Sequence, residues 1–276
     1  MKMGMLHLVM MRLTALGIVA GALWFAMNTK PLAYGIPPQG KVLVSSIDLP
    51  LLQFPEGITS WHGKVYVGTF NFLNPKGTRI FVFNAHTGKL LHTLGDPTKP
   101  GQALISNGAI LGLTINHATG DLFAAGNEKG YIVRIHEPDS DHPEVSIYAT
   151  YPNDAPASPG PEDMAFNAQG WLYASDSNNS RLYAIPPGGG KIELVVGPQG
   201  SGAKFSDHGL FAQSMPGAGL APNGLVFGLD FRTLYAANTD TDSVIALEVG
   251  KDGQLTGKIR TLAEHKRRLR GGPVRL

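Results

Sequence analysis

The chain has 276 residues and a mass of 29.4 kDa, and 43% of its residues are hydrophobic while only 16% are charged. This balance excludes a disordered chain and a multi-span membrane protein. The 35 glycines and 20 prolines favour many short strands joined by turns over long helices. The lack of cysteine excludes disulfide scaffolds, cysteine-bound zinc, iron–sulfur clusters and thiol catalysis.

Charge is distributed unevenly, and the formal net charge of +2 hides this. Of the 23 Lys and Arg residues, three lie in residues 1–30 and seven in residues 258–276. The residues between these segments carry 13 basic and 20 acidic groups. Because the body of the protein is acidic, we expect no nucleic-acid partner.

The first 30 residues have the pattern of a targeting segment. Lys2 and Arg12 are followed by an uncharged, mostly apolar run over residues 13–27, which Lys30 ends. The run is short for a full membrane span of ~20 residues but suits a signal peptide. We expect either a cleaved signal or an uncleaved membrane anchor, and a buried core helix is the remaining alternative. Both favoured interpretations predict a periplasmic or other extracytoplasmic location.

Residues 31–41 contain three prolines and are expected to form an extended spacer. Four similar segments follow, beginning at Glu56, Leu111, Glu162 and Asn223. Each combines a short apolar strand, a turn bearing Gly or Asp, and a second strand that carries an aromatic residue. The aromatic residues are Tyr66, Phe123, Tyr173 and Tyr235.

Two more strands complete each repeat, and their alternating apolar residues predict β-structure. The third strands are expected at residues 79–83, 131–135, 181–185 and 243–247, and the fourth at 89–93, 144–148, 191–195 and 256–260. Four strands repeating every 40–60 or so residues are typical of β-propeller blades. We therefore predict an all-β fold, a β-propeller of about four four-stranded blades over residues 42–260, with no helix after residue 30. A β-sandwich or another meander is the alternative.

Four short stretches point to a family of propellers. They are Phe-Pro-Glu-Gly-Ile at 54–58, Gly-Pro-Glu-Asp-Met at 160–164, Pro-Asn-Gly-Leu-Val-Phe at 222–227 and Leu-Tyr-Ala-Ala-Asn-Thr at 234–239. Over residues 42–260 the chain resembles the senescence-marker-protein, gluconolactonase and luciferin-regenerating-enzyme-like family, which is related to strictosidine-synthase-like and NHL-repeat propellers. The resemblance implies a six-bladed propeller with one divalent cation at the mouth of its channel, and lactone hydrolysis at that cation.

The resemblance also assigns roles to individual residues. Glu56 matches the cation ligand of the first blade, and Asn223 matches that of the fourth. Glu162 and Asp163 replace an Asn-Asp pair in the third blade, and the Asp of the fifth blade, which serves as ligand and general base, has no counterpart. Asp163 or Glu162 would therefore have to act as the base.

The residue types support a cation site independently of the resemblance. Glu56, Leu111, Glu162 and Asn223 are each expected just before the innermost strand of a repeat, so propeller geometry would direct them to one end of the channel. Three of the four are oxygen donors, and oxygen ligands select a hard cation, Ca²⁺ most readily. The alternative is that these residues only cap strands or pair with their neighbours.

Three further features complete the sequence-based expectations. Asp207 and His208, in the long Gly-rich loop 197–221, are candidate substrate contacts because long loops often carry function. Asp176, in the run Ser-Asp-Ser, is expected to tie a turn between strands. Residues 261–276 form a basic tail, which is either an anionic-surface patch or a frayed end.

Six blades of about 50 residues would need a longer body than residues 31–276 provide. The chain is therefore a truncated product, a smaller ring, or a half that self-associates through open blade faces. We expect an exported, cation-dependent lactonase-like hydrolase acting on a small lactone or ester, or an inactive remnant of one. The alternative is a non-catalytic NHL-like propeller that binds a protein or glycan at its channel face.

Overall fold

The computed structural model describes residues 54–264, with gaps at 72–76, 106–107, 127–129 and 213–220. The predicted targeting segment, the spacer and the end of the basic tail lie outside the described residues. Within the described ranges, the protein has no helix with the length and hydrophobicity needed to cross a membrane. A 3₁₀ turn at Gln102–Leu104 lies between the strands of blades 1 and 2.

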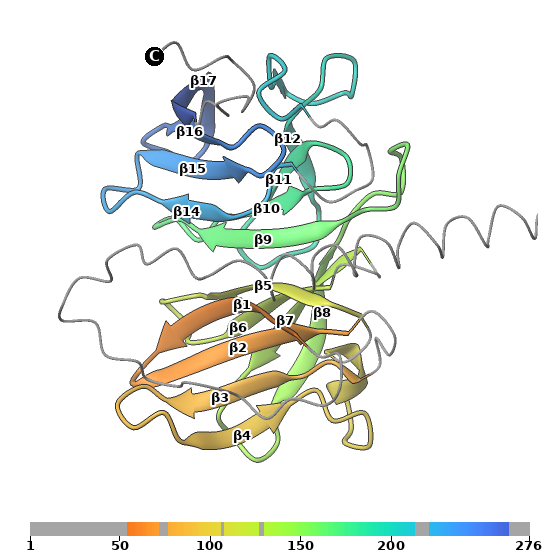
Figure 1. Ribbon diagram of the computed structural model, residues 1–276, viewed down its shortest axis with the longest axis vertical. Helices are drawn as coiled ribbons and strands as arrows, with labels where there is room; N and C mark the ends of the chain where they lie inside the picture. The colour runs from red at the N-terminus through yellow and green to blue at the C-terminus, as the bar shows by residue number, and fades with distance from the viewer. Residues whose placement is uncertain (1–53, 72–76, 106–107, 127–129, 213–220, 265–276) are drawn as a thin grey trace, which may run out of the picture. The chain divides into compact units, whose positions relative to one another are not determined.

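Four sheets follow one another along the chain, and each contains four antiparallel strands that form one blade (Figure 1). Blade 1 contains β1 (Phe54–Trp61), β2 (Lys64–Phe70), β3 (Ile80–Asn84) and β4 (Leu90–Leu94). Blade 2 contains β5 (Ile110–Ile115), β6 (Leu122–Gly126), β7 (Tyr131–His136) and β8 (Glu144–Thr150). Blade 3 contains β9 (Pro161–Phe166), β10 (Leu172–Asp176), β11 (Arg181–Ile185) and β12 (Glu193–Gly197), and blade 4 contains β14 (Leu225–Phe227), β15 (Thr233–Asn238), β16 (Ser243–Val249) and β17 (Leu255–Glu264). The predicted β-propeller of about four blades is confirmed.

Several strands begin or end one or two residues from their expected bounds, as at β12, and two strands differ further. β13 (Phe205–Ser206) adds a short parallel strand to the edge of blade 3, beside β12. β17 ends at Glu264 rather than at residue 260, because β16 pairs along its whole length and Ser243 lies opposite Glu264. The sheet of blade 4 therefore includes the first residues of the expected basic tail.

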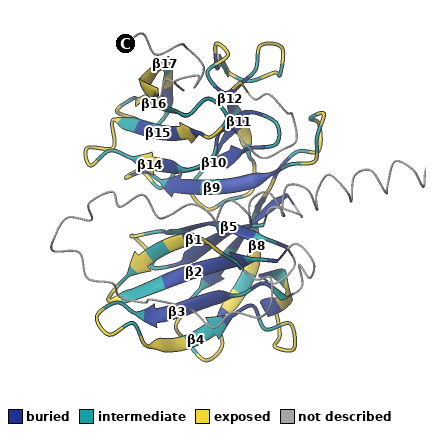
Figure 2. Cartoon of the chain, viewed as in Figure 1, coloured by how far each residue is buried: buried dark blue, intermediate teal, exposed yellow. Residues whose placement is uncertain are grey.

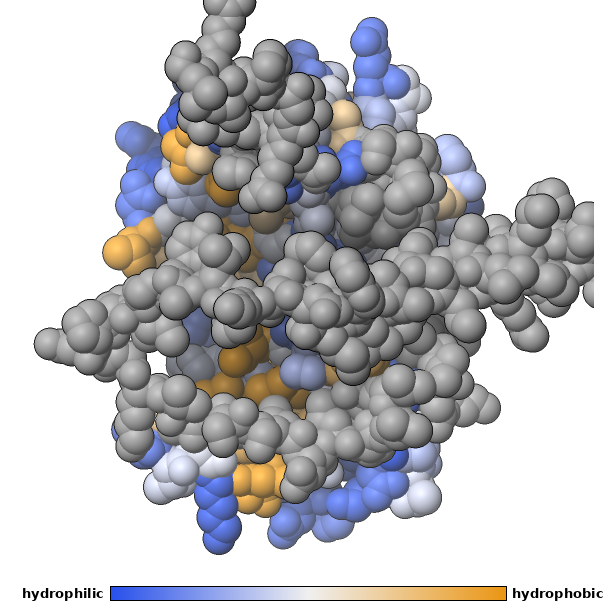
Figure 3. All heavy atoms as spheres, in the orientation of Figure 1, coloured by the Kyte–Doolittle hydropathy of each residue, from blue (hydrophilic) through white to orange (hydrophobic). Residues whose placement is uncertain are grey.

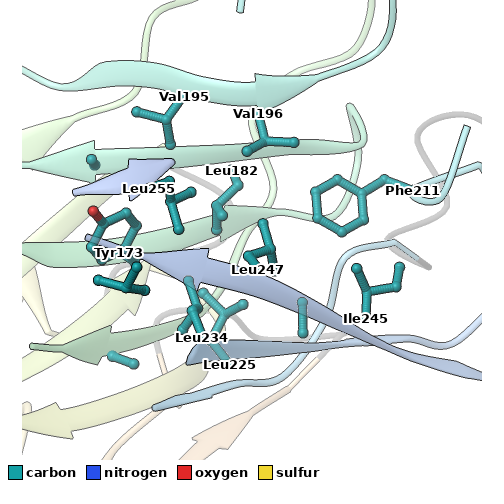
Figure 4. Close-up of a cluster of buried hydrophobic side chains, with 14 residues drawn as sticks. Tyr173, Leu182, Val195, Val196, Phe211, Leu225, Leu234, Ile245, Leu247 and Leu255 are labelled. Atoms are coloured by element: carbon teal, nitrogen blue, oxygen red, sulfur yellow. The ribbon is translucent and has the colours of Figure 1, made fainter. Parts of the chain in front are cut away.

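Side chains alternate between the two faces of each sheet, and the apolar ones form one core between each pair of consecutive blades. Tyr66, Ile80 and Val82 of blade 1 pack with residues of blade 2. Blades 2 and 3 share a second core, and a third lies between blades 3 and 4 (Figure 4). The middle strands are buried on both sides, whereas β4 and β17 carry much of the exposed surface (Figure 2).

The innermost strands of neighbouring blades pack closely, and glycines make this possible. A methyl group on Gly57 would lie 2.6 Å from the carbonyl oxygen of Leu111 in the next blade. A methyl group on Gly112 would overlap the carbonyl oxygen of Glu162 and lie 2.7 Å from the Cα atom of Asp163. Each of these glycines directly follows the first residue of its repeat. This packing places the first residues of successive repeats next to one another.

Candidate cation site

Glu162 and Asn223, which are 61 residues apart, meet where blades 3 and 4 adjoin. Glu162 is the second residue of the inner strand β9 of blade 3, and Asn223 precedes β14 of blade 4. The Nδ2 group of Asn223 donates a hydrogen bond to Glu162 Oε1 at 3.2 Å, and the hydroxyl of Ser177 donates to Oε2 at 3.1 Å. Two of the three predicted ligands are therefore in direct contact.

Glu162 has the surroundings of a carboxylate without a counterion. Its residue is 9% exposed, and burial raises the pKa of its side chain to about 7. The nearby charges of Glu56 and Asp163 raise this pKa further, while the hydrogen bonds from Ser177 and Asn223 lower it. In the described part of the chain, no ion pair joins Glu162 to a cationic side chain. Glu162 is thus a largely buried group in an electronegative environment.

Glu56 belongs to the same electrostatic region. It lies on β1 of blade 1 and is exposed, yet partial loss of hydration raises the pKa of its carboxylate. Its charge acts on Glu162, so blades 1, 3 and 4 all contribute to the region. Leu111, the corresponding residue of blade 2, offers no ligand.

The carboxylate of Asp163 is hydrogen-bonded to the neighbouring blade. Its Oδ2 atom accepts the backbone N–H of Leu225 at 2.7 Å, which joins β9 to β14. Burial raises the pKa of Asp163 to about 6, and the hydrogen bonds from the backbone N–H groups of Leu225 and Met164 oppose this shift. Asp163 occupies the repeat position that is glycine in the other three blades, and its carboxylate bridges the two inner strands.

The residues at the end of β10 support this arrangement. Ser175 Oγ accepts the N–H of Asp163 at 3.0 Å and donates to the carbonyl oxygen of Asn223 at 2.9 Å. Asp176 accepts hydrogen bonds from the backbone N–H of Gly160 at 2.9 Å and from the amide of Asn179. Asp176 therefore ties a turn, in agreement with the sequence-based expectation. The Ser-Asp-Ser run drew attention to this turn, but nothing in it predicted the contact of Ser177 with Glu162.

Asp207 and His208 lie at a separate, open groove of about 1130 Å³. Asp207 is buried, and its carboxylate accepts the backbone N–H groups of Gly209 at 3.0 Å and Phe211 at 3.2 Å. It therefore stabilises its own loop, whereas His208 is exposed beside it. The groove lining includes Asn178 but not Glu56, Glu162 or Asn223. Ser177 and Asn178, adjacent in the chain, connect the two places.

The donor chemistry fits a hydrated hard cation rather than a closed metal cage. Glu56, Glu162 and Asn223 supply oxygen atoms only. Within the described ranges, no group of three or more His, Cys, Asp or Glu side chains is arranged to hold a metal ion. Ca²⁺ takes six to eight ligands, so water and substrate would have to supply the rest.

One family model matches the chain, and it covers the centre of this site. It describes the N-terminal part of strictosidine synthase-like proteins and matches residues 154–178. This segment contains Glu162, Asp163 and Ser177, and the match agrees there with the resemblance found in the sequence. No curated protein matches the chain in sequence.

Solved structures show similarity in fold. Hydrazine synthase of Kuenenia stuttgartiensis is 12% identical, with a TM-score of 0.50 over 81% of this chain and 53% of that one. Virginiamycin B lyase of Staphylococcus aureus, solved with quinupristin, is 20% identical, with a TM-score of 0.47 over 74% and 55%. The calcium-binding protein regucalcin of Agrobacterium tumefaciens is 15% identical, with a TM-score of 0.49 over 77% and 60%. The chain thus spans little more than half of each, and the likeness shows the propeller fold alone.

Proposed function

We propose that the protein is an exported hydrolase of sugar lactones or related esters that depends on a divalent cation. One observation carries this proposal: the buried Glu162 carboxylate, held by Ser177 and Asn223, feels the negative charge of Glu56 without a cationic partner among the described residues. The apolar run over residues 13–27 supports export.

A bound cation would neutralise the negative charges of Glu162 and Glu56. Burial is the main reason why the pKa of Glu162 is high, and the negative charge of Glu56 adds to the shift. Glu56, Glu162 and the side-chain oxygen of Asn223 are the residues that would hold Ca²⁺. A cation bound there would polarise a lactone carbonyl and acidify a water molecule.

The chain offers two carboxylates that can accept a proton. Glu162 is the first candidate for a general base: burial raises its pKa to about 7, and a bound cation would lower this pKa again and keep the carboxylate deprotonated. Asp163 is the second candidate, although one of its oxygen atoms already accepts the Leu225 N–H. The groove beside Asn178 and His208 would hold the remainder of the substrate, and Asp207 keeps its loop in shape.

Calcium binding by calorimetry, paired with hydrolysis of a δ-lactone before and after chelation, tests the proposal. We expect Glu162→Gln to weaken Ca²⁺ binding by tenfold or more, because it removes a charged ligand without changing the shape of the site. Glu144→Gln is the matched control, since Glu144 is exposed on β8. Unchanged Ca²⁺ affinity in Glu162→Gln, or turnover that survives chelation, would contradict the proposal.

A second function deserves the same experiment because Asp163 is engaged with Leu225. If neither carboxylate acts as a base, the protein is a non-catalytic propeller that binds a glycan or a protein at its channel face. This alternative predicts that the protein holds no Ca²⁺ tightly and hydrolyses neither lactones nor aryl esters.

A further inference from the structure

The aromatic residue of each repeat packs toward the blade that follows. Tyr66, Phe123 and Tyr173 are at most 2% exposed, and Tyr66 and Tyr173 lie in the cores shared with the next blade. The hydroxyl of Tyr66 donates to Asp139, between β7 and β8. The hydroxyl of Tyr173 donates to the carbonyl oxygen of Gly253, between β16 and β17. Each tyrosine thus contacts the last connection of the next blade.

Blade 4 presents the same face without a following blade among the described residues. Leu234 and Ala236 face blade 3, so the alternating residue Tyr235 faces away from it. Tyr235 is partly exposed, and Val226, directly opposite it on β14, is 60% exposed. Apolar side chains also reach the surface elsewhere among the polar ones (Figure 3).

The inner strand of blade 4 is open in the same direction. Gly224 holds the repeat position of Gly57 and Gly112, both of which meet the backbone of the following blade. A methyl group on Gly224 would meet only Asp163 Oδ2 of blade 3, at 3.7 Å. Gly224 therefore has room for the next inner strand.

Blade 1 carries the complementary face. Ile58 on β1 lies opposite Val67, whereas Tyr66 packs into the core shared with blade 2. Ile58 therefore faces away from blade 2, and it is 67% exposed. In the other repeats the corresponding residues Leu113, Met164 and Leu225 are buried against the preceding blade.

We propose that the free face of blade 4 binds blade 1 of a second copy of this chain. The contact continues the interface already formed between blades 1 and 2, 2 and 3, and 3 and 4. Gly224 would pack on the backbone at Glu56, Val226 on Ile58, and the Tyr235 hydroxyl on the connection between β3 and β4. Such a contact joins two different surfaces, so it either closes a ring or extends into a longer assembly.

Charge substitutions at the two exposed positions test the proposal by complementation. Sedimentation of the full chain should show self-association, and Val226→Asp or Ile58→Asp alone should abolish it. Buffer and detergent are the same in every measurement. An equimolar mixture of the two variants should form a 1:1 dimer and nothing larger, because each variant keeps one intact face. Ile147→Asp is the control, since Ile147 is exposed on β8 of blade 2, which has a blade on either side.

Three results would overturn the proposal, and none depends on cation binding or hydrolysis. The first is a monomeric wild-type chain at all concentrations. The second is association that survives both Asp substitutions, and the third is a mixture that stays monomeric. Circular dichroism of each variant verifies that it has folded. Gly224→Ala, which leaves the contact with blade 3 uncrowded, should also weaken self-association as measured by sedimentation.

Discussion

A buried carboxylate without a cationic partner makes a folded protein less stable at neutral pH, and Glu162 has this character. Its pKa is raised from 4.5 to about 7, so the folded state binds a proton more tightly than the unfolded state. The resulting stability is fully present below pH 4.5 and is lost as the pH rises through 7. A shift of this size is worth on the order of 3 kcal/mol.

Glu162→Gln should therefore be more stable than the wild type at pH 8 in the presence of a chelator, and this gain should vanish near pH 4.5. Gln has no titrating group but keeps an acceptor for the Asn223 amide and a partner for the Ser177 hydroxyl. Urea unfolding at both pH values measures the difference. Equal stability differences at the two pH values would show that Glu162 is not desolvated as its surroundings require.

The sequence could predict part of this site but not all of it. Glu162 and Asn223 begin successive repeats, so their proximity follows from the repeat spacing once a propeller is assumed. Ser177 could not be foreseen, because its contact depends on a register shift in the pairing of β9 with β10, between Ala174 and Asp176. Asp163 could be identified as a departure from glycine, but its bond to the Leu225 N–H depends on how two inner strands meet.

At the scale of elements, the packing of inner strands makes opposite predictions for two equivalent glycines. Gly112→Ala places a methyl group against the backbone of Glu162 and Asp163, which cannot move without separating blades 2 and 3. We expect it to cost roughly 1–3 kcal/mol of unfolding free energy. Gly224→Ala should cost far less, because its nearest atom is a carboxylate oxygen at 3.7 Å.

Urea denaturation measures the loss of unfolding free energy in both variants. Each variant is the control for the other, because both carry the same substitution at equivalent repeat positions. Equal losses would mean that alanine is unfavourable in these strands for a reason other than contact with the next blade. Calcium affinity should fall in Gly112→Ala as well, since the clash displaces Glu162.

Strand positions were predictable where apolar residues alternate, and the four aromatic strands lie where the sequence placed them. The position of β13 was not predictable, because its two residues, Phe205 and Ser206, are too few to form an alternating pattern. The end of β17 was also missed. Its last four residues are exposed, and Leu262 lies at a register shift between the pairs that Thr261 and Ala263 make with β16, so hydrophobic alternation does not mark them.

At the scale of the whole molecule, the repeat period established the number of blades, but the sequence could not show which faces stay open. The openness of Tyr235 and Gly224 depends on what packs against them, and each residue matches its buried counterparts in type. The same holds for the proposed cation site, which is formed by Glu56, Glu162 and Asn223. They come from blades 1, 3 and 4, so their joint behaviour belongs to the propeller and not to any one blade.

A cation held by these three residues would link distant blades, and this predicts a global response to Ca²⁺. Binding to the folded state alone stabilises a protein by about 2.7 kcal/mol at a ligand concentration 100 times Kd. We expect Ca²⁺ to raise the Tm of the wild type and of Glu144→Gln, but not of Glu162→Gln. Hydrogen exchange should slow in β1, β9 and β14 together, because the ligands lie on or beside those strands. Protection confined to β9 would mean that Glu162 binds the ion without Glu56 and Asn223, and the proposed three-blade site would then be wrong.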